Sequence, residues 1–275
     1  MRRTKITAAL AVTAAFASVA PAMAANTTQR VTDNDVARQP ENTPPTRNWV
    51  IYNRNAGSAA FRVGPGTAPL GLGSLELTTP TGADKIQAFN YDHLGTPLSS
   101  INAMGYSNYR ETGNLQQTTA LNMEVDINGA APGGFTTLVF EPVYNTDQGS
   151  VVSGQWQTWD AYNGGNARWW STKNINGTCA FDCFSTWSSI VSNNPDAVVG
   201  GGYGLNQGSG NPGLVAANDA LTFGAGSDSV TYDFEPLVSP ANKDACKNGG
   251  WQTFNNPTFK NQGDCVSSFA PGKNK

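Results

Sequence analysis

The sequence predicts an all-β protein, an antiparallel jelly-roll-like β-sandwich with a short disulfide-closed C-terminal tail. Short runs of β-branched and aromatic residues recur roughly every 8 to 15 residues, between turns rich in glycine, asparagine and proline. Only the segment 184–191 has apolar residues at helical spacing. Charged residues make up 13% of the chain, so neutral polar groups are expected to dominate its surface.

The first residues have the features of a secretory signal peptide. Arg2, Arg3 and Lys5 precede an uncharged, alanine-rich stretch that ends in an A-x-A cleavage site. This pattern predicts cleavage after Ala24 and a secreted, extracellular protein. No later segment has about 18 apolar residues in a row, which argues against membrane insertion.

The charge of the mature chain excludes two classes of partner. Removal of residues 1–24 lowers Lys+Arg from 17 to 14 against 20 Asp+Glu, so the net charge becomes −6. The remaining positive charges are scattered along the sequence. Nucleic acid and anionic membranes attract clustered positive charge, so neither is a predicted partner.

Three segments follow the signal peptide. Residues 25–46 are polar and proline-bearing, and such a segment buries too little apolar surface to offset the entropy of ordering, so we expect a flexible lead-in. Residues 47–236 have the length and patterning of one β-sandwich domain. Pro236 and Pro240 mark the end of this domain, and residues 237–275 form a separate tail.

The clearest strand is 120–128, where apolar and polar residues alternate with a period of two. Its apolar positions include Leu121 and Met123, and its polar positions include Glu124 and Asp126. The predicted strands, in chain order, are 49–52, 60–63, 74–79, 85–91, 101–109, 120–128, 135–144, 151–162, 197–205, 216–223 and 229–234.

Four of the seven tryptophans fall within fifteen residues, in the segment 133–172 around which the chain is organised. The runs 135–144 and 151–162 flank a turn and predict a β-hairpin or two neighbouring strands. Alternation places Trp156 on one strand face with Asp160, and Trp159 on the other. One face is thus expected to fill the core while the other presents rings and polar groups outward.

This outward face is the candidate ligand-binding surface. Sugar rings stack on flat indoles, and neighbouring polar side chains bond their hydroxyls. The alternative is that the tryptophans fill the core, and adjacent indoles on a strand must point in opposite directions. The candidate binding residues are Trp156, Asp160, Tyr162, Trp169 and Trp170.

Four cysteines in an exported chain predict two disulfides, for which three pairings exist. Cys179 lies four residues before Cys183, and Cys246 lies nineteen before Cys265. The predicted pairing is local, Cys179 with Cys183 and Cys246 with Cys265. The second pair would then close the C-terminal tail.

Several stretches resemble a group of secreted bacterial proteins most familiar from actinobacteria. They are PLGLGSLEL, KIQAFNYDHLGTPLSSI, GGFTTLVFEPVYNTDQG, WQTWDAYNGGNARWWST, NNPDA and the tail stretch CKNGGWQTFNNPTFKNQGDCV. The tail stretch is the most specific of them. This resemblance implies an extracellular location and a shared fold architecture. It implies no particular activity. The core also resembles jelly-roll domains of lectins, glucanases and carbohydrate-binding modules.

The predicted strand 120–128 contains candidate catalytic residues. Glu124 and Asp126 share a strand face roughly 7 Å apart, a spacing that suits glycoside hydrolysis if one carboxyl stays protonated. The stretch 124–128 resembles the Glu-x-Asp-x-Glu signature of laminarinase-type glucanases, which implies Glu124 as nucleophile and Asp126 as its supporting carboxylate. Asn128 stands at the acid/base position and has no proton to donate. Glu141 is a further candidate carboxylate.

A solvated strand face explains the same residues. An open polar face would raise neither pKa by burial, so we expect no hydrolysis of β-glucans.

Two further residues, His93 and Asp219, each have a functional and a structural interpretation. His93 is the only histidine, and no Gly-x-Ser-x-Gly motif accompanies it, so a turn residue is the favoured interpretation. The stretch from Asn218 resembles the last strands of jelly-roll binding modules, where an acidic residue often holds a structural calcium. Asp219 is therefore a candidate calcium ligand, and a cap of a turn or strand is the alternative. No other cofactor is predicted.

These observations favour a secreted, non-catalytic β-sandwich that binds polysaccharide or a cell-surface glycan through an aromatic face. An extracellular glycoside hydrolase or lyase that uses Glu124, Asp126 or Glu141 is the first alternative. A structural cell-surface or matrix protein whose tail mediates association is the second.

Overall fold

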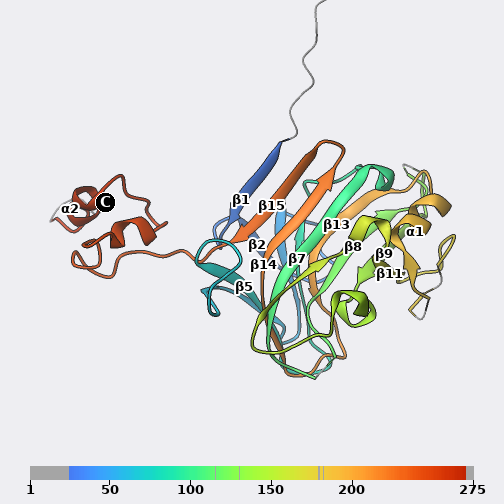
Figure 1. The fold of residues 1–275 in the computed structure, drawn as a ribbon, viewed down its shortest axis with the longest axis horizontal. Coiled ribbons are helices and arrows are strands. Elements are labelled where there is room, and N and C mark those ends of the chain that lie inside the picture. Colours follow the sequence, from blue (N-terminus) through green and yellow to red (C-terminus); the bar gives the residue numbers. More distant parts are fainter. Residues whose placement is uncertain (1–24, 115, 130, 179, 182, 271–275) are drawn as a thin grey trace, which may run out of the picture.

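A computed structural model describes residues 25–114, 116–129, 131–178, 180–181 and 183–270. Two β-sheets pack face to face and a small C-terminal lobe stands beside them (Figure 1). The predicted β-sandwich with a disulfide in its C-terminal region is therefore confirmed. Among the described residues, no helix is long and apolar enough to cross a membrane.

The first sheet is centred on β14, which pairs with β15, β5 and β7, while β10 pairs with β7. Strand β1 continues this sheet beyond β15, and β4 continues it beyond β5. Its strands are β1 (Asn26–Val31), β4 (Ser58–Val63), β5 (Gly73–Thr79), β7 (Ile101–Thr112), β10 (Trp156–Asp160), β14 (Leu214–Ala225) and β15 (Asp228–Phe234).

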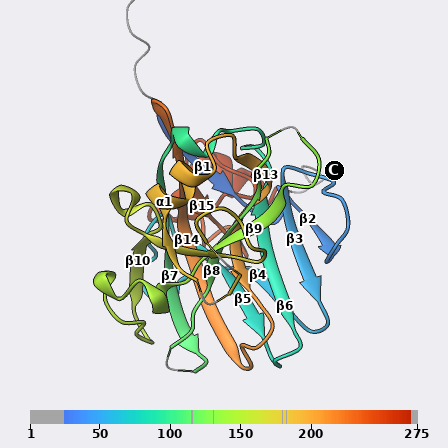
Figure 2. The same cartoon turned by 90° about the vertical axis from the view of Figure 1, so that its right-hand side faces the viewer.

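The second sheet has the strand order β12-β11-β9-β8-β13-β6-β3-β2. Figure 2 shows β6, β3 and β2 side by side at one end of it. Its strands are β2 (Val36–Pro40), β3 (Trp49–Arg54), β6 (Lys85–Asn90), β8 (Ala120–Asp126), β9 (Phe135–Phe140), β11 (Arg168–Ser171), β12 (Ser185–Thr186) and β13 (Val198–Gln207).

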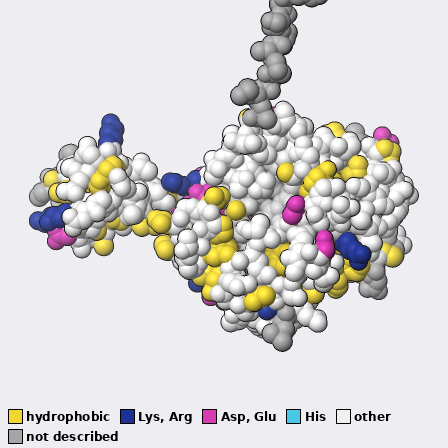
Figure 3. All heavy atoms as spheres, viewed as in Figure 1, with side chains coloured by type: hydrophobic (Ala, Val, Ile, Leu, Met, Phe, Trp, Pro, Cys, Tyr) yellow, Lys and Arg dark blue, Asp and Glu magenta, His cyan; other side chains and the backbone are white. Residues whose placement is uncertain are grey.

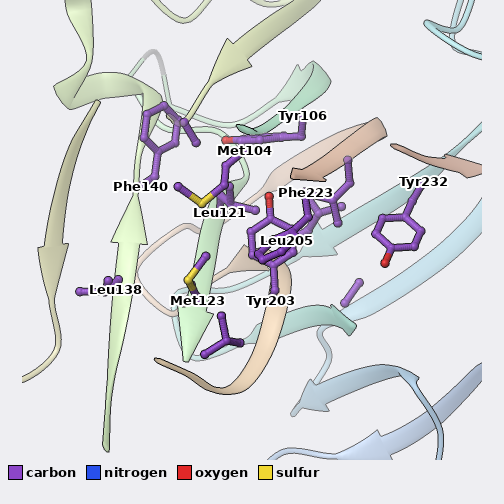
Figure 4. Packing of buried hydrophobic residues seen from close by; sticks show 14 of the residues in the cluster. Met104, Tyr106, Leu121, Met123, Leu138, Phe140, Tyr203, Leu205, Phe223 and Tyr232 are labelled. Atoms are coloured by element: carbon purple, nitrogen blue, oxygen red, sulfur yellow. The ribbon is translucent and has the colours of Figure 1, made fainter. Parts of the chain in front are cut away.

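The core lies between the inner faces of the two sheets, as the alternation in β8 predicts. Leu121, Met123 and Val125 are fully buried. Leu121 and Met123 lie in one layer with Tyr203 of β13 (Figure 4). Glu124, on the opposite face of β8, is partly exposed. The outer face of the second sheet is therefore free to form a site.

The remaining elements are short helices. The predicted helix is present as α1 (Trp187–Asn193), and it begins where the Thr186 hydroxyl accepts a hydrogen bond from the Ser189 amide. Its Trp187 and Ile190 side chains are buried in the core. The others are η1 (Leu98–Ser100), η2 (Pro142–Tyr144), η3 (Thr146–Gln148), η4 (Asn163–Gly165), η5 (Gly250–Thr253) and α2 (Gln262–Ser267).

The expectation of a flexible lead-in over 25–46 is wrong. β1 pairs in parallel with β15 and β2 pairs in parallel with β3, so the sandwich begins at Asn26 rather than at residue 47. The β1 side chains are exposed except that of Val31. An edge strand is held by backbone hydrogen bonds and needs few apolar side chains, so composition alone did not reveal these two strands.

The predicted hairpin of 135–144 and 151–162 is also wrong. β9 pairs with β8 and β11 in the second sheet, whereas β10 pairs with β7 in the first. The chain leaves β9 through η2 and η3 and crosses to the other sheet before β10 begins. In addition, β8 ends at Asp126, so Asn128 lies in the following turn and not on the strand face.

The C-terminal lobe is joined to the sandwich by an extended segment (Figures 1 and 3). The predicted disulfide Cys246–Cys265 closes it, and both sulfur-bearing residues are fully buried. The Asn255 amide donates to the Pro236 carbonyl and accepts from the Val238 amide. Cys183 is also disulfide-bonded. Its predicted partner, Cys179, lies outside the described residues.

Replacing both Cys246 and Cys265 by serine should loosen the lobe and leave the sandwich intact. In the chain-entropy model, a disulfide that closes a loop of this length contributes about 3 kcal/mol. Limited proteolysis read by mass spectrometry should show faster cleavage within 240–266, while the main calorimetric transition keeps its midpoint. A fall of the main transition would instead show that the lobe supports the sandwich.

Candidate functional site

A groove runs over the outer face of the second sheet. It consists of two adjoining hollows of about 560 and 320 Å³ that share Lys85, Asn122 and Thr172 among their lining residues. We call the two together the groove. Its lining comes mainly from outward-facing positions of β3, β6, β8, β9, β11 and β13, which are far apart in the sequence.

Glycines in β13 keep the floor of the groove open. The strand contains Gly200, Gly201 and Gly202, and its pairing with β8 shifts in register across this run. A Cβ atom on Gly201 would collide with the Glu124 side chain, and one on Gly202 would collide with the Phe89 ring. Larger residues here would displace the acidic and aromatic side chains that line the groove.

Aromatic rings stand on both sides of this floor. On one side the Tyr52 and Tyr91 hydroxyls are 3.0 Å apart, and the Tyr52 and Phe89 rings meet edge to face. On the other side Trp170 packs against Phe181, with ring centroids 5.3 Å apart and planes 30° apart. Phe181 is 62% exposed, so its ring is open to solvent beside the groove.

Neutral polar atoms in the groove lack partners within the protein. The buried Oδ1 atoms of Asn122, Asn206 and Asn211 have no hydrogen-bond partner among the described residues. All three side chains line the smaller hollow. Buried amide groups are nearly always hydrogen-bonded in folded proteins, so these atoms are suited to a hydroxyl-bearing ligand or to bound water.

Two half-buried carboxyls complete the groove. Glu124 accepts a hydrogen bond from the Gly202 amide at 2.7 Å, and Glu141 accepts one from the Trp170 indole at 2.8 Å. Burial raises the pKa of each carboxyl above its ordinary value, and the hydrogen bond to each lowers it in part. The expectation that burial would raise neither pKa on this face is therefore wrong for Glu124.

The two carboxyl-bearing residues lie far apart along the sheet and line different hollows of the groove. Glu124 pairs with Thr137, so Glu124 and Glu141 are offset by four residues along neighbouring strands. At about 3.3 Å per residue and 4.8 Å between strands, their Cα atoms lie roughly 14 Å apart. Asp126 is occupied elsewhere, because its carboxylate accepts a hydrogen bond from the Asn128 amide in the turn after β8.

The basic residues of the groove are paired. Glu41 lies 3.1 Å from the Arg54 guanidinium and 3.3 Å from the Lys85 ammonium. Lys85 also lowers the pKa of Glu124, as the weakest of three influences on that carboxyl. Two basic and three acidic residues thus line the groove, and both basic ones share one carboxylate.

The structure does not bring the five predicted binding residues together. Trp170 lines the groove, but its neighbour Trp169 is fully buried in the core. Trp156 lies in β10 of the first sheet, where its indole donates to the Pro65 carbonyl. The Asp160 carboxylate accepts from the Tyr162 and Asn163 amides and so holds the turn after β10.

Most residues that line the groove are not among the five predicted binding residues. Gln87 and Phe89 of β6 and Tyr91 just after it follow one another at a spacing of two, which is the signal of one strand face. The predicted binding residues came instead from the tryptophan-rich segment 133–172. Its members separate because β10 and β11 belong to different sheets.

His93 lies outside the groove and has a packing role. Its ring stacks on Phe223 with centroids 3.8 Å apart, and one ring nitrogen is 3.0 Å from the Tyr232 hydroxyl. Burial lowers the pKa of His93 to about 4, so the ring is neutral at physiological pH.

Asp219 has a capping role. Its two carboxylate oxygens accept hydrogen bonds from the Leu70 amide at 2.8 Å and the Phe234 amide at 3.1 Å. These bonds tie β14 to the 64–72 loop and to β15. Within the described part of the chain, no group of three or more His, Cys, Asp or Glu side chains is arranged to hold a metal ion.

Comparison of the chain with protein-family models, curated proteins and solved structures found no match. The fold and the groove define the chain as an all-β sandwich with an aromatic, acid-bearing groove on one outer face.

Proposed function

We propose that this is a secreted, non-catalytic β-sandwich protein that binds polysaccharide or another glycan in the groove. The observation that carries the proposal is the gathering of aromatic rings and amide oxygens along one sheet face. Of the rings, Tyr91 and Trp170 are partly exposed and Phe181 is largely exposed. The amide oxygens have no hydrogen-bond partner among the described residues. The rings offer stacking surfaces for the C–H faces of sugars, and the amides offer acceptors for hydroxyl groups. The predicted signal peptide and the cystine-closed lobe support an extracellular location.

The groove replaces the face of β10 as the proposed binding surface. Of the five predicted binding residues, Trp170 remains, joined by Tyr91 after β6 and by the exposed Phe181. Tyr52 and Phe89 also line the groove, but their side chains are mostly buried and support the ring of Tyr91. Because rings stand on both sides of the floor, an extended chain of sugars would contact both sets.

A hydrolase is the second candidate, and one observation favours it. Burial raises the pKa of both Glu124 and Glu141, as a general acid requires. Their placement in different hollows, with Cα atoms roughly 14 Å apart, opposes it. Glycosidases hold their two carboxyl groups about 5 to 9.5 Å apart across one glycosidic bond. We expect no release of reducing ends from β-glucans. Release that is lost on Glu124→Gln would favour the hydrolase.

Replacing Trp170 by alanine should weaken glycan binding while the protein stays folded. A central aromatic anchor contributes about 2 kcal/mol or more, which corresponds to roughly a thirtyfold loss of affinity. Trp156→Ala is the matched control, since Trp156 is also half-buried but lies on the other sheet. A glycan array followed by calorimetry provides the measurement. Equal affinity for both variants and the wild type would rule out the groove as the binding site.

A further inference from the structure

We propose that the glycan bound in the groove carries ammonium groups, as a deacetylated amino-sugar polymer does, and that Glu141 with Trp170 and Phe181 holds one of them. This inference rests on the proposed function and adds the chemical class of the ligand. It starts from the charge of the groove and from the rings beside one of its carboxyls.

Glu141 is a half-buried carboxyl that lacks a cation. Its side chain accepts one hydrogen bond, from the neutral indole of Trp170, and no described Lys, Arg or His lies within 4.0 Å of it. The basic groups nearest in the groove, Arg54 and Lys85, are paired with Glu41. Removing a carboxylate from water is costly unless a positive charge accompanies it. A cationic ligand would supply that charge.

The rings beside Glu141 suit the same ligand. Trp170 and Phe181 pack with a tilt of 30°, and Phe181 is largely exposed. An ammonium group over the face of an indole or phenyl ring is attracted by the ring quadrupole, most strongly where water is excluded. Because the Trp170 indole N–H points to Glu141, a cation placed over the ring also lies close to the carboxylate. The two attractions therefore act at one place.

Glu124 provides a second acidic point further along the groove. It lies roughly 14 Å from Glu141 between Cα atoms, which is longer than a single sugar ring. A polymer with an ammonium on each residue would meet both carboxyls, whereas a monosaccharide would meet one. The partnerless oxygens of Asn122 and Asn206 lie in the same groove and accept hydrogen bonds from hydroxyl or ammonium donors. The groove thus presents acceptors and negative charge to its ligand.

The test compares three β-1,4-linked hexasaccharides on the full mature chain: glucosamine, N-acetylglucosamine and glucose. Calorimetry at mildly acidic pH should show the glucosamine oligomer binding about tenfold more tightly than the two neutral ones. Raising the salt concentration should reduce that preference, because screening weakens charge interactions and leaves stacking unchanged.

The variant Glu141→Gln should remove most of this preference, because it weakens binding of the glucosamine oligomer far more than binding of the neutral ones. Glutamine keeps the shape of the side chain and still accepts from the Trp170 indole. Asp126→Asn is the matched control, since Asp126 lies on the same strand face as Glu124 but outside the groove lining. Thermal unfolding of each variant confirms that it is folded.

The outcomes separate the inference from the function on which it rests. Equal binding of all three oligomers, or a preference that survives Glu141→Gln, overturns the ammonium subsite and leaves glycan binding standing. Binding of none of the three overturns the proposed function and the inference with it.

Discussion

Replacing Trp169 by alanine is expected to cost about 3 to 5 kcal/mol of folding stability, the range for a large aromatic residue removed from a core. Its side chain is fully buried and packs against the rings of Phe140 and Trp187, with centroids 5.6 and 5.7 Å away. Its indole donates to the Ala161 carbonyl at 2.9 Å, and that buried carbonyl would lose its partner. Chemical denaturation of the variant measures the loss.

Trp170→Ala is the control for this experiment. It changes the neighbouring residue on the same strand, where the indole faces the groove and is partly exposed. We expect a clearly smaller loss of stability from it. If Trp169→Ala were as stable as the wild type and bound glycan less well, Trp169 would belong to the site and not to the core.

The class of fold could be predicted because alternation along a strand is a local signal. In β8 the residues Leu121, Met123 and Val125 face the core as their spacing indicates, and Trp187 and Ile190 of α1 do the same at helical spacing. Burial of such side chains is the main driving force for the sandwich. Each of these assignments needs only a short window of sequence.

The pairing of strands could not be predicted in the same way. β9 and β10 are neighbours in the sequence, yet they belong to opposite sheets. The edge strands β1 and β2 are held by backbone hydrogen bonds to β15 and β3, and no side-chain pattern marks them. Both errors concern contacts between segments, which the identity of nearby residues does not specify.

The candidate site could not be predicted for the same reason. Tyr52, Phe89, Glu124 and Trp170 come from four different strands, and only the order of the second sheet brings them into one groove. The raised pKa of Glu124 likewise depends on burial in that groove, which a single strand cannot show. A cluster of tryptophans in sequence was therefore a poor guide to a cluster in space.

The pH dependence of stability provides the second large effect, and Asp219 is its main source. Burial raises the pKa of Asp219 from 3.8 to about 7, although hydrogen bonds from backbone amides lower it in part. Burial likewise raises the pKa of Asp233, with help from neighbouring Glu235, to about 6. Consider a pH between the pKa of such a carboxyl in the unfolded chain and its pKa in the folded protein. At that pH the folded state holds a proton that the unfolded state has released. The stabilising contribution of these two carboxyls is therefore fully present below about pH 4 and is lost as the pH rises towards 7.

His93 acts in the opposite direction over part of this range. Its folded pKa is about 4 against 6.5, so the unfolded state binds the extra proton and stability rises with pH between these values. The two carboxyls together contribute a larger pH-dependent change in folding stability than the one imidazole. The wild type should therefore still lose stability as the pH rises from 4 towards 7. The contribution of Asp219 alone is about 4 kcal/mol at 1.36 kcal/mol per unit of pKa.

Asp219→Asn isolates that contribution. Asparagine does not titrate, so the difference in unfolding free energy between pH 4.5 and 7.5 should shrink by about 3 kcal/mol relative to the wild type. The variant should also be less stable at the acidic end. Its single amide oxygen can accept from only one of the Leu70 and Phe234 amides, and the NH2 group faces the other donor. Asp228→Asn is the control, since Asp228 is exposed at the start of β15. An unchanged pH profile in Asp219→Asn would show that this carboxyl is ionised in the folded protein throughout the range.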